Sequence, residues 1–351
     1  MDIPRSALPP GVLSLHILPA EHHDRDWDAI IVPREVKERL LAQALLVLQH
    51  GRKLSMLAGL PHGLIVLAGP PGTGKTTMAR GLAQVAALAL ARQGATALVE
   101  INPHAFPSDM LGESQRNVTR LLTETIPEIA ARRPHVIVLI DEVESFAVRR
   151  SSASFDANPV DVHRATDAVL LGIDEIAKNL PSVLFVTTTN FIEAVDEAFL
   201  SRADLVMTFS LPDRETIGKI LEHALGELAV QWPSLQAMTE DAAKLSELAA
   251  LCEGWDGLRI RKLVLAALAQ RLDVARDPST LSWDDLMTAA RKKGGVEWAG
   301  GRAPTSRELF PDVPKELMHD HDHGHALHDD QHDHDHSHGH RHTHTHQKDE
   351  V

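Results

Sequence analysis

The sequence predicts an α/β fold with a parallel sheet flanked by helices, followed by a small all-α lid domain and a disordered, histidine-rich tail. Short apolar runs alternate with longer amphipathic stretches in the first two thirds of the chain, as in sheets buried on both faces. Beyond Pro212 only helical patterns recur, and from Gly294 onward glycine, proline and charge predominate. The expected parts are an irregular lead-in over 1–26, the α/β domain over 27–211, the lid over 212–293 and the tail over 294–351.

Each element follows from its local pattern. Helices are expected where apolar residues recur every three or four positions, and strands where short apolar or β-branched runs occur. In the α/β domain the expected helices cover residues 36–48, 76–90, 115–131 and 161–179, and the expected strands cover 64–68, 98–101, 135–140 and 183–189. In the lid the expected helices cover residues 214–229, 239–252, 258–275 and 282–292.

A glycine-rich segment after the first of these α/β strands carries the most specific motif of the chain. The pattern G-x-x-x-x-G-K-[ST] is completed by Gly69, Pro70, Pro71, Gly72, Thr73, Gly74, Lys75 and Thr76, with Thr77 directly after it. In this pattern backbone N–H groups surround the phosphates, the lysine reaches the β- and γ-phosphates, and the last hydroxyl holds Mg²⁺. The helix that follows directs its positive N-terminal end at the same anion. The motif therefore predicts a site for ATP and Mg²⁺.

Polar side chains follow two further expected strands. Asp141 and Glu142 come after the strand over 135–140, and Asn190 comes after the strand over 183–189. We expect Asp141 to reach Mg²⁺, Glu142 to polarise the attacking water and Asn190 to hold that water in line. An Asp-Glu pair alone is often an ordinary solvated strand end, but the three strand ends in this order favour catalysis.

Composition narrows the class of protein. A formal net charge of −14, an aromatic content of 4% and the absence of tyrosine argue against nucleic-acid binding, which needs clustered cations or stacking platforms. The single cysteine, Cys252, excludes an internal disulfide and is typical of a reducing compartment. No apolar run approaches the ~20 residues needed to span a bilayer. We therefore expect a cytoplasmic protein without membrane or nucleic-acid partners.

These motifs resemble the AAA+ ATPases, and among them the pachytene-checkpoint or thyroid-receptor-interactor type that remodels HORMA-domain proteins. The resemblance runs from about Trp27 to Ala290 and is most specific at residues 139–145 (Leu-Ile-Asp-Glu-Val-Glu-Ser) and 201–204 (Ser-Arg-Ala-Asp). It implies a homohexameric ring in which Arg202 reaches the neighbouring subunit's ATP. Short bacterial versions resemble proteins encoded beside anti-phage signalling genes, so the resemblance implies a HORMA-like client. The alternative for Arg202 is a surface ion pair with Asp204 or Asp196.

The resemblance also implies a second phosphate sensor in the lid and a substrate-gripping loop. Residues 257–262 are similar to the family's glycine-arginine segment, so Arg261 is expected to contact the γ-phosphate, or Arg259 if the register differs. An exposed helical arginine is also often merely solvated. In the loop, Met110 and Leu111 stand where the family has a bulky aromatic, and they either grip by apolar contact or pack as ordinary loop residues.

The tail is unusual in its histidine content. Thirteen of the 22 histidines lie between His319 and His346, interspersed with aspartates. Imidazole and carboxylate groups suit Zn²⁺ and Ni²⁺, so the tail either binds such ions loosely or is only a solvated extension. Two further functions therefore stay open: an AAA+ ATPase that acts on nucleic-acid complexes, and a metal-handling NTPase that uses this tail.

Overall fold

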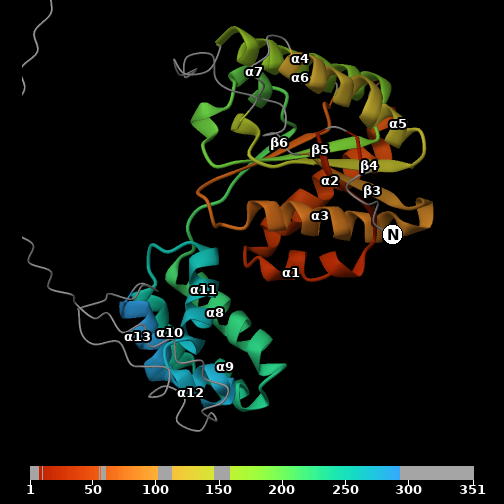
Figure 1. Cartoon of the computed structure of the whole chain (residues 1–351). Coiled ribbons are helices and arrows are strands. Elements are labelled where there is room, and N and C mark those ends of the chain that lie inside the picture. The colour runs from red at the N-terminus through yellow and green to blue at the C-terminus, as the bar shows by residue number, and fades with distance from the viewer. Residues whose placement is uncertain are drawn as a thin grey trace, which may run out of the picture. The chain divides into compact units, whose positions relative to one another are not determined.

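A computed structural model describes residues 8–9, 11–54, 56, 61–101, 113–145 and 159–292, with the side chains of 113–114 and 159–164 left aside (Figure 1). The histidine-rich tail and the expected gripping loop with Met110 and Leu111 lie outside the described residues. The predictions for them therefore stay predictions.

Within the described residues, the α/β part is built on a six-stranded sheet. Its strands are β1 (Val12–Leu18), β2 (Leu64–Ala68), β3 (Thr96–Ile101), β4 (His135–Ile140), β5 (Val183–Thr189) and β6 (Leu205–Thr208). They lie in the order β1-β3-β4-β5-β2-β6, and all neighbours are parallel except β1 and β3. The predicted α/β fold with a parallel sheet is confirmed, with an antiparallel strand added at one edge.

The edge strand β1 differs from the expected irregular lead-in over 1–26. It pairs with β3 from Val12 opposite Ile101 to Leu18 opposite Thr96. The middle of this strand, residues 13–17, has the sequence Leu-Ser-Leu-His-Ile. Apolar and polar residues alternate there, as in a strand with one buried face. Prolines on both sides of this short segment hide the alternation in the sequence, because proline favours irregular connections.

Helices cover both faces of the sheet (Figure 1). They are α1 (Asp26–Ala29), α2 (Arg34–Leu54), α3 (Lys75–Leu90), α4 (Glu113–Arg120), α5 (Ile126–Ala130), α6 (Pro159–Asn179) and α7 (Glu197–Leu200), with a π-helical turn (Leu121–Thr125) between α4 and α5. Alternate side chains of a strand enter opposite cores: Phe185 packs with residues of α4, α5 and α6, whereas Leu184 packs with residues of α2 and α3. Burial on both faces explains why β2 and β4 consist almost entirely of apolar residues.

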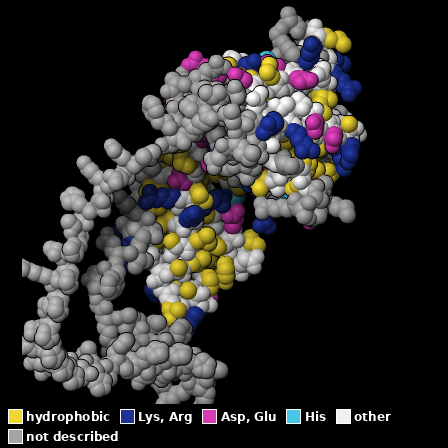
Figure 2. Space-filling model, turned by 45° about the horizontal axis from the view of Figure 1, so that its top comes forward, with side chains coloured by type: hydrophobic (Ala, Val, Ile, Leu, Met, Phe, Trp, Pro, Cys, Tyr) yellow, Lys and Arg dark blue, Asp and Glu magenta, His cyan; other side chains and the backbone are white. Residues whose placement is uncertain are grey.

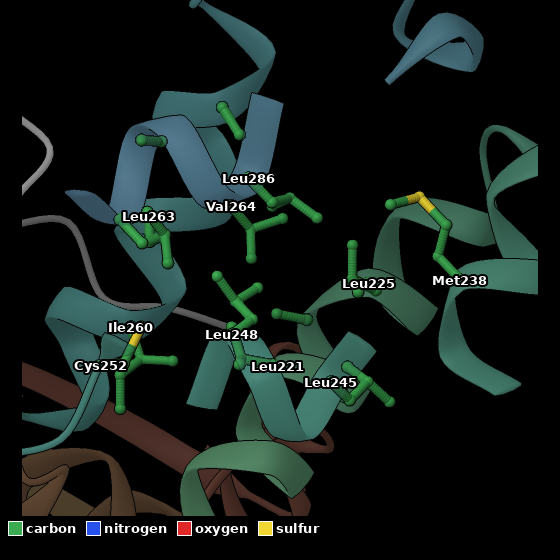
Figure 3. Packing of buried hydrophobic residues seen from close by; sticks show 14 of the residues in the cluster. Leu221, Leu225, Met238, Leu245, Leu248, Cys252, Ile260, Leu263, Val264 and Leu286 are labelled. Carbon is green, nitrogen blue, oxygen red and sulfur yellow. The ribbon is translucent and has the colours of Figure 1, made fainter. Parts of the chain in front are cut away.

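The remaining described residues form a helical part with its own core. Its helices are α8 (Arg214–Ala229), α9 (Gln236–Glu240), α10 (Ala242–Leu251), α11 (Gly257–Leu268), α12 (Leu272–Arg276) and α13 (Trp283–Arg291). Leu221, Leu248 and Val264 meet in this core together with Cys252 (Figure 3). None of the described helices is long and apolar enough to cross a bilayer.

One expected helix of this part is broken. The sequence pattern predicts a continuous helix over 258–275, but the backbone is extended at Arg271, with φ −133° and ψ 146°. The Arg271 guanidinium donates to Asp285 of α13 at 2.9 Å, and Asp285 also forms a capping box with Ser282. This buried carboxylate holds the arginine at the break between α11 and α12.

Candidate nucleotide-binding site

The glycine-rich loop joins the end of β2 to the start of α3. Gly72 and Gly74 have left-handed backbone angles, with φ of 77° and 89°. A Cβ atom on Gly72 would overlap the Asp256 carboxylate, and one on Gly74 would overlap the Ile30 side chain. Both positions therefore need glycine for conformation and for space. The loop turns sharply and places the first turn of α3 directly behind it, as a phosphate-binding loop requires.

Lys75 lies inside this loop and is only 6% exposed. Its ammonium donates to the carbonyl oxygens of Gly69 (2.8 Å) and Pro70 (2.9 Å) and to Asn190 Oδ1 (2.9 Å). Burial lowers the pKa of Lys75, and the carboxylates of Asp141, Glu144 and Glu142 oppose that shift. These contacts bring the loop cation and the end of β5 together.

The carboxylates after β4 meet the same loop. Because β5 pairs in parallel with both β4 and β2, the carboxyl ends of all three strands lie at one edge of the sheet. Asp141 Oδ1 accepts hydrogen bonds from Thr76 Oγ1 at 2.7 Å and from Thr188 Oγ1. Asn190 Nδ2 donates to Glu142 Oε1 at 3.2 Å. The structure thus brings together Lys75, Thr76, Asp141, Glu142 and Asn190.

Glu142 has an unusual backbone conformation. Its φ of 54° places a non-glycine residue in the left-handed region, which costs on the order of 1–3 kcal/mol. Hydrogen bonds from both the backbone N–H (3.0 Å) and the hydroxyl (2.9 Å) of Ser145 to the Glu142 carbonyl support this conformation. The strained residue is the carboxylate expected to activate water.

Sequence reasoning missed two residues that position this site. Thr188 Oγ1 donates to Asp141 and accepts the Glu142 backbone N–H at 3.1 Å, so one hydroxyl orients both acidic residues. Glu144 Oε1 accepts the backbone N–H of Asn190 at 3.0 Å, while its buried Oε2 has no hydrogen-bond partner among the described residues. The available signal was the run of threonines in a buried strand, because buried hydroxyls need partners.

A cavity of about 570 Å³ adjoins the loop. Thr77 and the apolar residues Ile30, Ile31 and Val32 are among the residues that line it. At the start of α11, Leu258 donates its backbone N–H to Gly72 O at 3.0 Å. The cavity is large enough for a nucleoside and is mostly apolar, as ligand sites usually are.

The structure distinguishes the two lid arginines. Arg261 lines the cavity, and its guanidinium donates to Glu227 (2.8 Å) and to the carbonyl of Ala29 (3.0 Å). Arg259 instead lies over the Trp255 ring, with its guanidinium carbon 4.1 Å from the ring centroid. Of the two, Arg261 is the one among the residues that line the cavity.

Arg202 lies apart from the residues that meet at the glycine-rich loop. Its guanidinium forms a two-point ion pair with Asp174 of α6, at 2.7 and 2.8 Å, and donates to the carbonyl of Ala198. The pair lowers the pKa of Asp174 chiefly through this hydrogen bonding. Asp204, one of the partners considered from the sequence, instead accepts backbone N–H groups of residues 62–64. Arg202 does not line the described nucleotide cavity.

Comparisons with known proteins agree with this geometry. Residues 65–211 match the model of the ATPase family associated with various cellular activities (AAA). The chain is 41% identical to CD-NTase-associated protein 6 of Pseudomonas aeruginosa over 297 residues, which cover 85% of this chain and 97% of that protein. It is 32% identical to a pachytene checkpoint protein 2 homolog of Arabidopsis thaliana, over 81% of this chain and 67% of that protein.

Two solved structures share the fold. The structure of C. elegans PCH-2 superposes with a TM-score of 0.64 at 24% identity, covering 82% of this chain and 76% of that one. A chain in the E. coli MS115-1 HORMA:CdnC:Trip13 complex also gives a TM-score of 0.64, at 22% identity, covering 80% of this chain and 95% of that one.

Proposed function

Because the chain belongs to the AAA family of ATPases, among the relatives of CD-NTase-associated protein 6 and pachytene checkpoint protein 2, we propose that it hydrolyses ATP to remodel a HORMA-like partner protein. The observation that carries the proposal is the meeting of a phosphate-binding loop, a hydroxyl-carboxylate pair and a second carboxylate at one edge of the sheet.

The oxygen donors of the site suit Mg²⁺. Thr76 Oγ1 and Asp141 Oδ1 lie 2.7 Å apart, and a hydroxyl with a carboxylate is the usual protein contribution to a Mg²⁺-ATP complex. When bound, Mg²⁺ would neutralise charge on the phosphates. The protein residues to which we assign this role are Thr76 and Asp141.

The remaining residues divide the chemistry. The backbone of residues 69–74 would surround the phosphates, and the Lys75 ammonium would place its charge near the β- and γ-phosphates. Glu142 would polarise the attacking water, and Asn190, which contacts both Glu142 and Lys75, would orient it. Arg261 would contact the γ-phosphate from the helical part.

We assign Arg202 to the neighbouring subunit's site in a homohexameric ring. An arginine that acts in trans stabilises charge on the transferring phosphoryl group and does not need to face its own subunit's nucleotide. The location of Arg202 outside the described cavity supports this assignment, and its contact with Asp174 would hold it in position.

The HORMA-like client rests on the relatives. One of the two solved structures that share the fold is a HORMA:CdnC:Trip13 complex, and a relative of high coverage is a CD-NTase-associated protein. On the face that Figure 2 shows, basic and acidic side chains are interspersed, which with the net charge of −14 does not favour nucleic acid as the client. The tail needed for a metal-handling NTPase lies outside the described residues. A cytoplasmic location stays a prediction.

The test is ATP hydrolysis by the purified full chain, with and without a HORMA-domain protein. We expect phosphate release that the partner stimulates and that double-stranded DNA does not. Glu142→Gln should abolish release while nucleotide binding, measured by fluorescence of a labelled ATP, persists, because only the polarising carboxylate is lost. Stimulation by DNA but not by the HORMA protein would contradict the proposed client.

A further inference from the structure

Three histidines gather at a place that the nucleotide site does not use. His16 lies on β1, and His22 and His23 lie on the adjoining 3-10 turn (Glu21–His23). Their ring centroids are 4.1 to 5.4 Å apart, and one nitrogen from each ring lies within 4.8 Å of the other two. Among the described residues, this is the one group of three or more histidine, cysteine or acidic side chains spaced for a metal ion.

The hydrogen bonding of His23 is typical of a metal-binding histidine. It is 6% exposed, and its Nδ1 lies 2.7 Å from Asp26 Oδ2. The carboxylate favours the proton on Nδ1, which leaves the lone pair on Nε2. That Nε2 is buried and has no hydrogen-bond partner among the described residues. A carboxylate on one ring nitrogen and a metal on the other is the usual arrangement of metal-bound histidines.

The surrounding cavity is polar and can hold an ion with water. It has a volume of about 420 Å³ and is lined by all three histidines together with Ser14, Asp26, Arg80 and Glu100. Arg80 is paired with Glu100 through two hydrogen bonds of 2.8 and 3.0 Å, so the positive charge of Arg80 is neutralised locally. The carboxylate of Asp26 then gives the cavity a negative charge. Ser14 Oγ is buried without a hydrogen-bond partner among the described residues, which is a second unsatisfied polar atom on this wall.

We propose that His16, His22 and His23 bind a divalent transition metal of the Zn²⁺ class, with the fourth position open to water. Zn–N distances of about 2.0–2.1 Å require the three nitrogens to be about 3.4 Å apart, so the side chains close by roughly an ångström on binding. The metal ties β1 to the turn that follows it. That turn is also held to α3, because Gln84 accepts the Ala20 backbone N–H at 3.0 Å and donates to Asp24 at 2.6 Å. Metal binding therefore fastens the first strand to the layer that carries the phosphate loop.

The histidine-rich tail complicates a simple titration, because it offers many further imidazoles. A measurement of thermal stability distinguishes metal binding at the three histidines from metal binding at the tail. A ligand stabilises a fold only when it binds the folded state better than the unfolded state. The three-histidine site exists only when β1 and the turn are folded. The tail, whose composition predicts disorder, is expected to bind metal equally in both states and to leave the midpoint unchanged.

The experiment measures the thermal midpoint of the full chain with Zn²⁺ and with a chelator. We expect Zn²⁺ to raise the midpoint by on the order of 5 °C at a hundredfold excess over Kd. His22→Ala should lose this rise without unfolding the protein, because His22 is exposed. His16→Ala should lose it as well, and His50→Ala, which removes an exposed histidine from α2, should keep it. No rise in the wild type, or an undiminished rise in His22→Ala and His16→Ala, would overturn the proposal.

Discussion

A single hydroxyl group positions both acidic residues of the nucleotide site. Thr188 Oγ1 donates to Asp141 and accepts the backbone N–H of Glu142, in a residue with φ of 54°. An orienting group of this kind acts on the reaction through the residues it holds, and its loss typically costs 10- to 100-fold. The geometry of the candidate site therefore depends on a side chain that is expected to touch neither ATP nor water.

Thr188→Val tests this role, because valine keeps the shape and removes the hydroxyl. We expect roughly a 10- to 100-fold loss in ATP hydrolysis rate with nearly unchanged nucleotide affinity. Thr187→Val is the matched control, because its hydroxyl, on the same strand, donates to the Ile65 carbonyl at 3.4 Å. Equal rates for the two variants would show that Thr188 does not position the carboxylates.

The residues that sequence reasoning found and missed differ in one respect. Lys75 and Thr76 belong to one contiguous motif, and Asp141 and Asn190 stand at strand ends, so a local pattern reveals each of them. Thr188 acts through Asp141 and Glu142, which follow the neighbouring strand β4. Asp174 contacts Arg202, which is 28 positions later in the sequence. Such contacts depend on the register and packing of elements, which a local pattern does not contain.

At the scale of elements, the long buried strands were predictable and the edges were not. β4 and the first half of β5 are apolar runs because both faces are covered, and the bounds of the two strands match the expected 135–140 and 183–189. β1 is half covered and lies between prolines, so its short alternation carries little signal. The break at Arg271 depends on the Asp285 carboxylate of another helix, so the apolar spacing of 258–275 alone could not predict it.

Cys252, the one cysteine of the chain, allows the burial of the core of the helical part to be tested by thiol labelling. This side chain is fully buried, and burial raises the pKa of the Cys252 thiol to about 11. The reactive thiolate is therefore scarce in the native protein at pH 8, whereas an unfolded cysteine has a pKa of about 8.5. We expect little labelling by a thiol-specific chromogenic disulfide in buffer and complete labelling in denaturant.

The rate of that labelling then reports the opening of the helical part, because no other thiol contributes. Raising the pH from 8 to 9 should speed labelling of the unfolded chain only modestly, since its thiol is already partly ionised. Fast, complete labelling of native protein with an intact circular dichroism spectrum would contradict the buried position of Cys252.

At the scale of the whole molecule, the proposed ring requires each ATP site to be shared. Glu142 contacts Asn190 within the described site, whereas Arg202 contacts Asp174 and lies outside the described cavity. The two residues are therefore assigned to different subunits at every site. This division predicts that two inactive variants can restore each other.

Mixing Arg202→Ala with Glu142→Gln tests this division. Each variant alone should lose at least about 10³-fold in hydrolysis rate. Arg202→Ala lacks the arginine that acts in the neighbouring site, and Glu142→Gln lacks the carboxylate that polarises water. In a 1:1 mixed ring, about a quarter of the interfaces would join an intact Glu142 to an intact neighbouring Arg202, because contacts in a ring run head to tail. We expect phosphate release to rise with mixing and to peak near equal amounts. The control is a mixture of either variant with the Arg202→Ala/Glu142→Gln double variant, which supplies no new combination. If co-purified mixed assemblies release no more phosphate than the parent variants at any ratio, Arg202 does not act in the neighbouring site.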